Sequence, residues 1–349
     1  MIKVHPDLCP FTETVHFLLI SKFDDEVKNM IISDLDGLEL NGKEVYQKYF
    51  ASYQKFIEVF KNNRKSNEFD DFFMASYEVN DRLFFIGMGD LAKKIQDSPH
   101  PIADVEINKK IIDLCVRNLN AVDYFKEIEF EIENPTFEEI FDFLMSVKMA
   151  DHLKWKLVTI IKNPQKYMNQ LIELIQLNLP VFEKAATAIK EELDGYLKNY
   201  RDRMKSGSED PFYKAIGESS TIKNIAPSFA SADIQWYGTE YAIYGLLSDI
   251  FKDLLSPEEN RKQNMLAKFK VLSDASRFEI LLTLKESPKY SLEIAELLGL
   301  APSTVSHHMN LLLVNELVRH TISGGKFYYH LEKENFEQLQ KNFKHFFLD

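Results

Sequence analysis

The chain of 349 residues is long enough for two domains and has a formal net charge of −12 at pH 7. Hydrophobic residues make up 45% of it, with 27 Phe and 15 Tyr, so we expect packed, aromatic-rich cores. Its two cysteines, Cys9 and Cys115, exclude a disulfide framework. The sequence has no basic-then-apolar leader and no apolar run of about 18 residues, which excludes a signal peptide and a transmembrane helix. We therefore expect a soluble protein of the cytoplasm.

The negative charge is unevenly distributed along the chain. Residues 257–331 contain 9 Lys and Arg against 8 Asp and Glu, and residues 332–349 contain 3 against 4. The net charge of −12 therefore falls on residues 1–256. Since acidic surfaces repel phosphate, only the near-neutral C-terminal segment is expected to approach nucleic acid.

Residues 1–204 are expected to be mostly helical. The segment "EVYQKYFASYQKFIEVF" has apolar residues at helical spacing, namely Tyr46, Phe50, Tyr53, Ile57 and Phe60. Prolines suited to a first helical turn predict three later helices that begin near Pro135, Pro164 and Pro180. Residues 1–5 are expected to form a short strand, and "GMGD" at 87–90 is too short to count as a phosphate-binding loop.

Composition changes in two places and predicts the domain organisation. Gly, Ser, Pro and charged residues at 205–220 indicate a loop, and the β-branched and aromatic residues that follow predict two or three short strands. A second boundary falls at "LSPEEN", residues 255–260. We therefore expect a mainly helical domain at 1–255 that regulates or supports a dimer, and a second domain at 256–349.

The C-terminal segment has the pattern of a winged helix-turn-helix. Asp274 is placed to cap one helix, and Gly299 can adopt the left-handed conformation that separates a short helix from one restarting at Pro302. Gly324-Gly325 lies between two runs of β-forming residues, which predicts a hairpin wing. A final amphipathic helix has Phe336, Leu339, Phe343 and Phe347 on one face.

Residues of about 262–331 resemble the winged-helix domain of the ArsR family of bacterial transcriptional regulators. The resemblance rests on "LSDASRFEILLTL", "LEIAELLGLAPSTVSHHMNLL" and "ELVRHTISGGKFYYHL", in this order and spacing, and it covers about a fifth of the chain. It implies a C-terminal winged helix with a β-hairpin. Together with the helices and few short strands expected in the N-terminal domain, the expected fold class is mainly α. A long region before such a domain also resembles larger, uncharacterised members of the family.

The second helix of the motif, residues 302–316, is expected to read DNA. Advancing 100° per residue places Val305, Met309 and Leu312 on the core side and polar residues on the opposite face and its flanks. These candidates are Ser303, Thr304, Ser306, His307 and Asn310. On the wing, Arg319 and Lys326 are the candidate phosphate or minor-groove contacts. The family usually has a polar cap followed by Gln where this chain has Ala301-Pro302, so its sequence preference is expected to differ.

The same residues also allow other chemistries. Ser303 and His307 could form a nucleophile and its base, but no acidic orienting residue or oxyanion loop accompanies them. His307 and His308 diverge by about 100° on a helix and would not converge on a metal. A polar surface helix without ligand remains an alternative.

Many family members bind metal through cysteines near the short helix, but the corresponding positions are Tyr290 and Leu292. A second family site uses histidine and acid pairs of the last helix, and here only His345 is present. Because zinc and softer metals need three or four suitable ligands, we expect no metal sensing at the winged helix. No cofactor and no catalytic residues are expected, so the protein is not expected to be an enzyme.

We therefore expect a dimeric DNA-binding transcriptional regulator, by resemblance a repressor, that binds a double-stranded operator. Family members dimerise through helices bracketing the winged helix, which here implies Phe269, Phe336, Leu339, Phe343 and Phe347 as dimer contacts. An unidentified small-molecule effector could bind the aromatic region of 1–255, and no membrane partner is expected. The alternative is an enzymatic or ligand-binding domain at 1–255 with a winged helix used for protein interaction. No motif in the sequence identifies the operator, the regulated genes or the effector.

Overall fold

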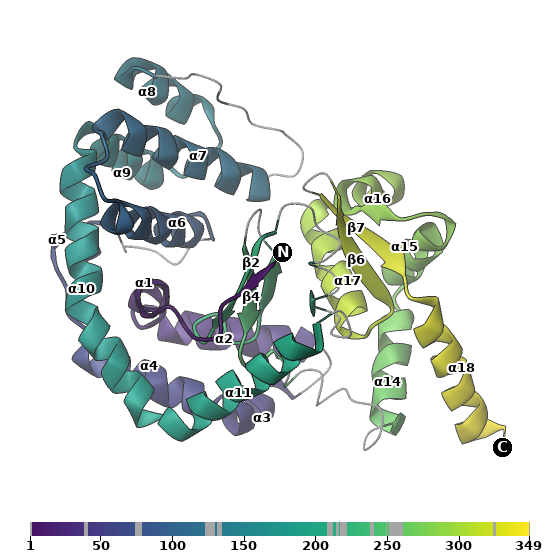
Figure 1. Ribbon diagram of the computed structural model, residues 1–349. Helices are drawn as coiled ribbons and strands as arrows, with labels where there is room; N and C mark the ends of the chain where they lie inside the picture. The colour runs from purple at the N-terminus through teal and green to yellow at the C-terminus, as the bar shows by residue number, and fades with distance from the viewer. Residues whose placement is uncertain are drawn as a thin grey trace. The chain divides into compact units, whose positions relative to one another are not determined.

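Helices make up most of the chain in the computed structural model, and short strands form two small sheets (Figure 1). The structure describes residues 2–37, 41–73, 79–122, 130, 135–207, 212–213, 216, 222–237, 241–248, 250, 261–323 and 326–348. Two compact units are formed, one by residues 1–8, 28–53 and 191–349 and the other by residues 9–27 and 54–190. The expected boundary at 255–260 lies outside the described residues, as does much of the 205–220 segment. The expected mainly α fold is confirmed.

The N-terminal helices follow one another closely along the chain. They are α1 (Pro10–Ile20), α2 (Asp24–Gly37), α3 (Gly42–Tyr49), α4 (Ala51–Asn63), α5 (Glu68–Phe73), α6 (Val79–Asp97), α7 (Asp104–Val122), α8 (Phe137–Ser146), α9 (Asp151–Lys162), α10 (Pro164–Ala188) and α11 (Lys190–Ser206). Helix α10 packs against α1, α5, α6, α7 and α9. Its Phe182 joins the rings of Phe17, Phe56 and Phe60, with centroid separations from 4.2 Å for Phe17–Phe56 to 6.3 Å for Phe17–Phe182. The expected aromatic-rich core is therefore present in this unit.

Two helix predictions need correction. Residues 46–60 form two helices, because α3 ends at Tyr49 and α4 begins at Ala51, although all five predicted apolar residues are buried. Pro180 does not begin a helix but lies inside α10, and the break comes at Ile189 instead. Burial of Leu174 and Ile175 before the proline, and of Val181 and Phe182 after it, keeps the helix continuous. Pro180 itself is exposed, so water can reach the carbonyl that loses its partner.

Two glycines of "GMGD" serve close helix packing. An added Cβ at Gly89 of α6 would lie 2.5 Å from Val15 Cγ1 of α1, and one at Gly87 would lie 2.6 Å from Leu114 Cδ2 of α7. Both distances are too short for a carbon–carbon contact. The glycines therefore allow α6 to approach both neighbouring helices.

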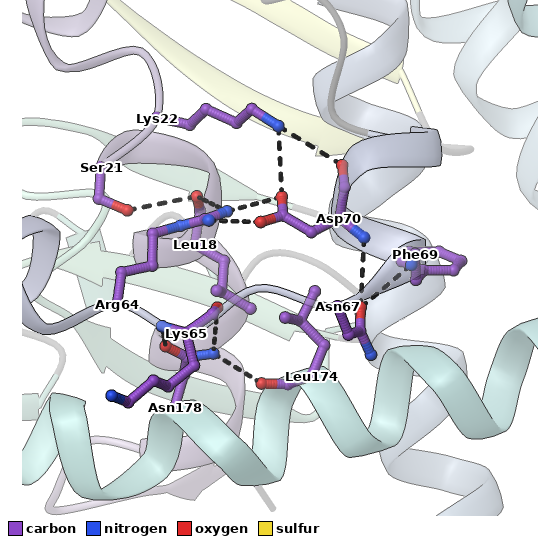
Figure 2. A network of polar contacts seen from close by, with 10 residues as sticks. All are labelled: Leu18, Ser21, Lys22, Arg64, Lys65, Asn67, Phe69, Asp70, Leu174 and Asn178. Atoms are coloured by element: carbon purple, nitrogen blue, oxygen red, sulfur yellow. Dashed lines mark hydrogen bonds and ion pairs between the residues drawn. The ribbon is translucent and has the colours of Figure 1, made fainter.

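A buried network of polar groups joins the end of α1, the 64–67 loop, α5 and α10 (Figure 2). Both Asp70 carboxylate oxygens accept bonds from the Arg64 guanidinium, and Lys22 Nζ lies 3.4 Å from Asp70 Oδ1. Beside them, the buried amide of Asn178 accepts from Lys65 N and donates to Lys65 O and Leu174 O. The network fixes an irregular stretch of backbone onto two long helices.

The predicted strands near both ends of residues 1–255 belong to one sheet. Strands β1 (Lys3–Val4), β2 (Asn224–Ser228), β3 (Gln235–Tyr237) and β4 (Tyr241–Gly245) have the order β1-β2-β4-β3. β1, β2 and β4 run parallel, and β3 runs antiparallel to β4. The Tyr53 hydroxyl donates to Ala230 O and the Tyr200 hydroxyl donates to His5 O, so buried tyrosines anchor both the loop after β2 and the end of β1.

The C-terminal segment forms the expected winged helix. Its elements are α14 (Arg261–Leu272), α15 (Ala275–Glu286), β5 (Lys289–Tyr290), α16 (Ser291–Leu298), α17 (Pro302–Val314), β6 (Val318–Ser323), β7 (Lys326–Leu331) and α18 (Lys333–Phe347). The strands form an antiparallel sheet in the order β5-β7-β6. Gly324 and Gly325 lie outside the described residues, but the flanking strands pair with Ser323 opposite Lys326. The core includes Ile280, Ile294, Val305, Met309 and Leu312.

Candidate nucleic-acid interface

The turn between α16 and α17 sets the position of α17. Gly299 has φ 63° and ψ 31°, and Leu300 N donates to Ala295 O at 3.0 Å. A left-handed residue at this position lets the chain reverse sharply without the steric penalty of a Cβ. Ala295 is buried where α16 and α17 pack, which confirms the helix-turn-helix expected from the sequence.

Two faces of α17 differ sharply in polarity. Val305, Met309 and Leu312 are fully buried in the winged-helix core. Thr304, His307 and Asn310 are exposed, and Ser306 is half-buried. The side chain of Ser303 lies outside the described residues. The structure thus brings three of the five predicted side chains together at intervals of three residues, which places them along one side of the helix.

The two adjacent histidines of α17 occupy different environments. His307 points to solvent, whereas His308 is buried. Burial lowers the pKa of His308, and the nearby Asp274 carboxylate opposes this effect. Asp274 accepts a bond from Arg277 N at 2.9 Å, as expected of the cap of α15. Of the pair, only His307 can meet a ligand.

The wing is held at its base by side chains of its own strands. Thr321 Oγ1 lies 2.8 Å from His330 Nε2, and burial lowers the pKa of His320 to about 4. His320 is therefore neutral near pH 7 and adds no charge to the wing. Arg319 is exposed, and its Nε lies 3.4 Å from Glu332 Oε2. The Lys326 side chain lies outside the described residues.

Helices α14 and α18 lie side by side (Figure 1), and an aromatic contact joins them. Phe269 and Phe343 pack edge to face with ring centroids 6.0 Å apart, and Phe343 contacts Phe347 at 5.1 Å. Phe343 is 43% exposed and Phe347 is 63% exposed. Leu339 is buried within the chain, and Phe336 packs against the winged-helix core. Leu266 of α14, Phe346 of α18 and Leu348 directly after α18 are exposed as well.

Tyr290, at one of the positions of the family's metal-binding cysteines, makes structural contacts in this chain. Tyr290 pairs with Tyr328 across the sheet, and their rings meet edge to face at 5.7 Å. Tyr290 N also donates to Glu293 Oε2, and Tyr290 occupies the cap position of α16. Among the described residues, no three His, Cys, Asp or Glu side chains converge as metal ligands. None of the helices in the described part of the chain is long and apolar enough to cross a membrane.

Comparison with known proteins identifies the segment that carries this geometry. Residues 274–320 match the family of bacterial regulatory proteins called the arsR family. The arsenical resistance operon repressor of Staphylococcus xylosus is 38% identical over 73 residues, which are 21% of this chain and 70% of that protein. The repressor of the same description from Staphylococcus aureus is 36% identical over the same shares of the two chains. No solved structure matches the chain. The helix-turn-helix geometry, the wing and these relatives together show that the chain belongs to the ArsR family of bacterial regulatory proteins.

Proposed function

We propose that this protein is a DNA-binding transcriptional repressor whose α17 enters the major groove of an operator. The observation that carries the proposal is the exposed polar face of Thr304, His307 and Asn310, opposite a buried apolar face. Side chains of this kind on the second helix of a helix-turn-helix can donate to and accept from base edges. Two relatives are described as operon repressors, which supports the direction of regulation.

The wing supplies the second part of the interface. Arg319 uses Nε for Glu332, and its terminal nitrogens form no bond within the described part of the chain. A guanidinium oriented by one carboxylate in this way can offer its remaining donors to a phosphate. We assign the same role to Lys326. We assign Ser303 to the DNA-facing surface of α17 and Ser306 to its flank.

The functional form is a homodimer. One winged helix reads only a few base pairs, so useful specificity requires two copies about one DNA turn apart. The exposed aromatic surface of α14 and α18 offers a self-complementary apolar patch of the kind that a two-fold interface needs. Phe269, Phe343 and Phe347 lie in this surface, whereas Phe336 and Leu339 support it from within.

Residues 1–255 are assigned to regulation or to support of the dimer, and residues 256–349 to DNA binding. No metal effector is expected at the cysteine site that the family has in its winged helix, because Tyr290 and Leu292 offer no thiolate there. We place the protein in the cytoplasm, where a regulator meets its operator. The competing function is an enzymatic or ligand-binding domain whose winged helix contacts protein.

Selection of bound duplexes from a random-sequence DNA library by the full chain tests the proposal. We expect enrichment of a site with two half-sites about 10 base pairs apart. Affinity for that site should fall by about tenfold or more between about 50 and 200 mM salt, because phosphate contacts release counterions. A library that stays unenriched, with no salt-dependent binding of any duplex, would favour the competing function.

A further inference from the structure

Helices α8 and α9 display a row of aromatic side chains on the surface. Phe137 lies 6.3 Å from Phe141 on α8, and Phe141 lies 6.4 Å from Trp155 on α9, between ring centroids. Trp155 is 59% exposed and Phe137 is 38% exposed. We call these three residues the aromatic patch. Tryptophan is large and apolar, so its exposure in a row of rings marks a surface suited to a partner.

Two carboxylates border the aromatic patch. Glu138 and Asp142 line a shallow hollow of about 310 Å³ together with Phe137 and Phe141. Glu139 on the same helix is occupied, because it accepts bonds from Thr136 in the cap of α8. Glu138 and Asp142 are exposed and form no ion pair or hydrogen bond within the described part of the chain. The hollow therefore combines ring faces with two carboxylates available to a ligand.

The rings of this patch already accept a cation within the chain. Lys162 Nζ of α9 lies 5.1 Å from the centroid of the Phe137 ring. That distance is within the range in which an ammonium group is attracted by the π electrons of a ring. Phe141 and Trp155 have no such cation among the described residues.

We propose that the aromatic patch, with Glu138 and Asp142, binds a basic segment of a partner protein. An Arg or Lys side chain of that segment would lie on the rings of Phe141 and Trp155 and form ion pairs with the two carboxylates. Trp and Arg are among the residues that contribute most binding energy at protein interfaces. The two carboxylates outnumber the single ammonium group of Lys162 at these rings, which favours this occupant over nucleic acid or an anionic lipid surface. A hollow this open does not enclose a small molecule as ligand pockets do.

Fluorescence anisotropy of a dye-labelled peptide with three Gly-Arg-Leu repeats tests the proposal on the full chain. We expect saturable binding, and no binding of the same peptide with Glu in place of Arg. Trp155→Ala and the double variant Glu138→Gln/Asp142→Asn should each weaken binding by about threefold to tenfold, in keeping with exposed cation–π contacts and ion pairs. These side chains are exposed, so circular dichroism should show unchanged folding.

Matched variants elsewhere separate the patch from general attraction to an acidic protein. Glu191→Gln/Glu192→Gln removes two exposed charges at the start of α11, and Leu177→Ala removes an exposed apolar group of α10. Both should bind the peptide as the wild type does.

Equal weakening in these controls, or no peptide binding at all, would overturn the proposal. Tetraphenylphosphonium serves as a small-cation competitor. If it displaced the peptide and bound more tightly than the peptide does, the patch would be a small-cation site instead. Loss of self-association in Trp155→Ala would indicate a second copy of the chain. The proposal does not depend on DNA binding, so its failure leaves the proposed function intact.

Discussion

The rings of Phe269 and Phe343 meet edge to face 6.0 Å apart, and this contact joins α14 to α18 across the two ends of the winged-helix segment. The contact uses one side of the Phe343 ring and leaves 43% of the residue exposed. Phe347 extends the same surface by one helical turn. Helices α14 and α18 thus contact each other and also expose apolar rings, and such a pair can dock against the same pair in a second copy.

Phe343→Glu should convert the proposed dimer to a monomer. A carboxylate at the centre of an apolar interface would be desolvated without a partner, which costs several kcal/mol. Sedimentation velocity at micromolar concentration measures the change, and operator binding should fall with it because half-site pairing is lost. Leu297→Glu is the matched control, since Leu297 is 61% exposed on α16 and lies outside the α14–α18 surface. A wild-type chain that sediments as a monomer and still binds its operator would contradict the dimer proposal.

His307→Ala and Asn310→Ala should each weaken binding to the selected operator by about 1–3 kcal/mol per lost base contact. Random-sequence DNA should bind these variants nearly as before, because phosphate contacts remain. Gln338→Ala, an exposed polar change on α18, serves as the control. Anisotropy titrations on both duplexes measure the ratio, and an unchanged operator affinity in both α17 variants would show that this helix does not read bases.

Arg319→Ala should weaken binding to all sequences alike and lower the slope of log affinity against log salt by about 1. Glu332→Gln should leave the slope unchanged or raise affinity slightly, since it removes only the partner of Arg319 Nε. Lys326→Ala should behave as Arg319→Ala does. If Arg319→Ala changed affinity for one operator only, the wing would be reading sequence rather than phosphate.

Zn²⁺, arsenite and chelators should leave operator affinity unchanged. This chain has Tyr290 and Leu292 at the positions of the family's cysteine site, and its last helix has His345 as its one histidine at the second, histidine-and-acid site. Anisotropy with and without each agent measures the affinity, and metal analysis of the purified chain measures occupancy. Stoichiometric metal together with release from DNA would contradict this prediction.

The winged helix could be predicted from sequence because local signals there agree with one another. Gly299, the cap at Asp274 and the buried period of Val305, Met309 and Leu312 each specify the same short segment. The cap of α16 is a further local signal, because the Glu293 side chain accepts a bond from Tyr290 N three residues earlier.

The N-terminal region was less predictable because tertiary packing overrides local rules there. Pro180 satisfies the rule for a helix start, yet burial on both sides of it keeps α10 continuous. The Arg64–Asp70 pair is separated by only six residues, but its burial depends on α1 and α10, which no local pattern specifies. The exposure of Trp155 likewise depends on which helices pack around α9. Local patterns therefore predicted that this region is helical better than they predicted which of its side chains face solvent.

Gly89→Ala should destabilise the protein, although alanine is the better helix former. An added Cβ would lie 2.5 Å from Val15 Cγ1 and 2.8 Å from Val15 Cγ2. Val15 is buried in α1, and a β-branched residue in a helix has one strongly preferred rotamer, so it cannot turn aside cheaply. Overpacking costs about 1–3 kcal/mol, and the gain in helix propensity of up to about 1 kcal/mol offsets only part of it. Denaturant titration measures the change in the free energy of unfolding.

Gly195→Ala provides the opposite outcome in the same chain. Gly195 lies within α11, and an added Cβ there would meet no atom within 4 Å. That variant should gain about 0.5–1 kcal/mol from helix propensity alone. A double-mutant cycle of Gly89→Ala with Val15→Ala should then show a coupling energy of at least about 1 kcal/mol, because shortening Val15 relieves the clash. If Gly89→Ala stabilised the chain as Gly195→Ala does, close packing of α6 against α1 would not be what the glycine provides.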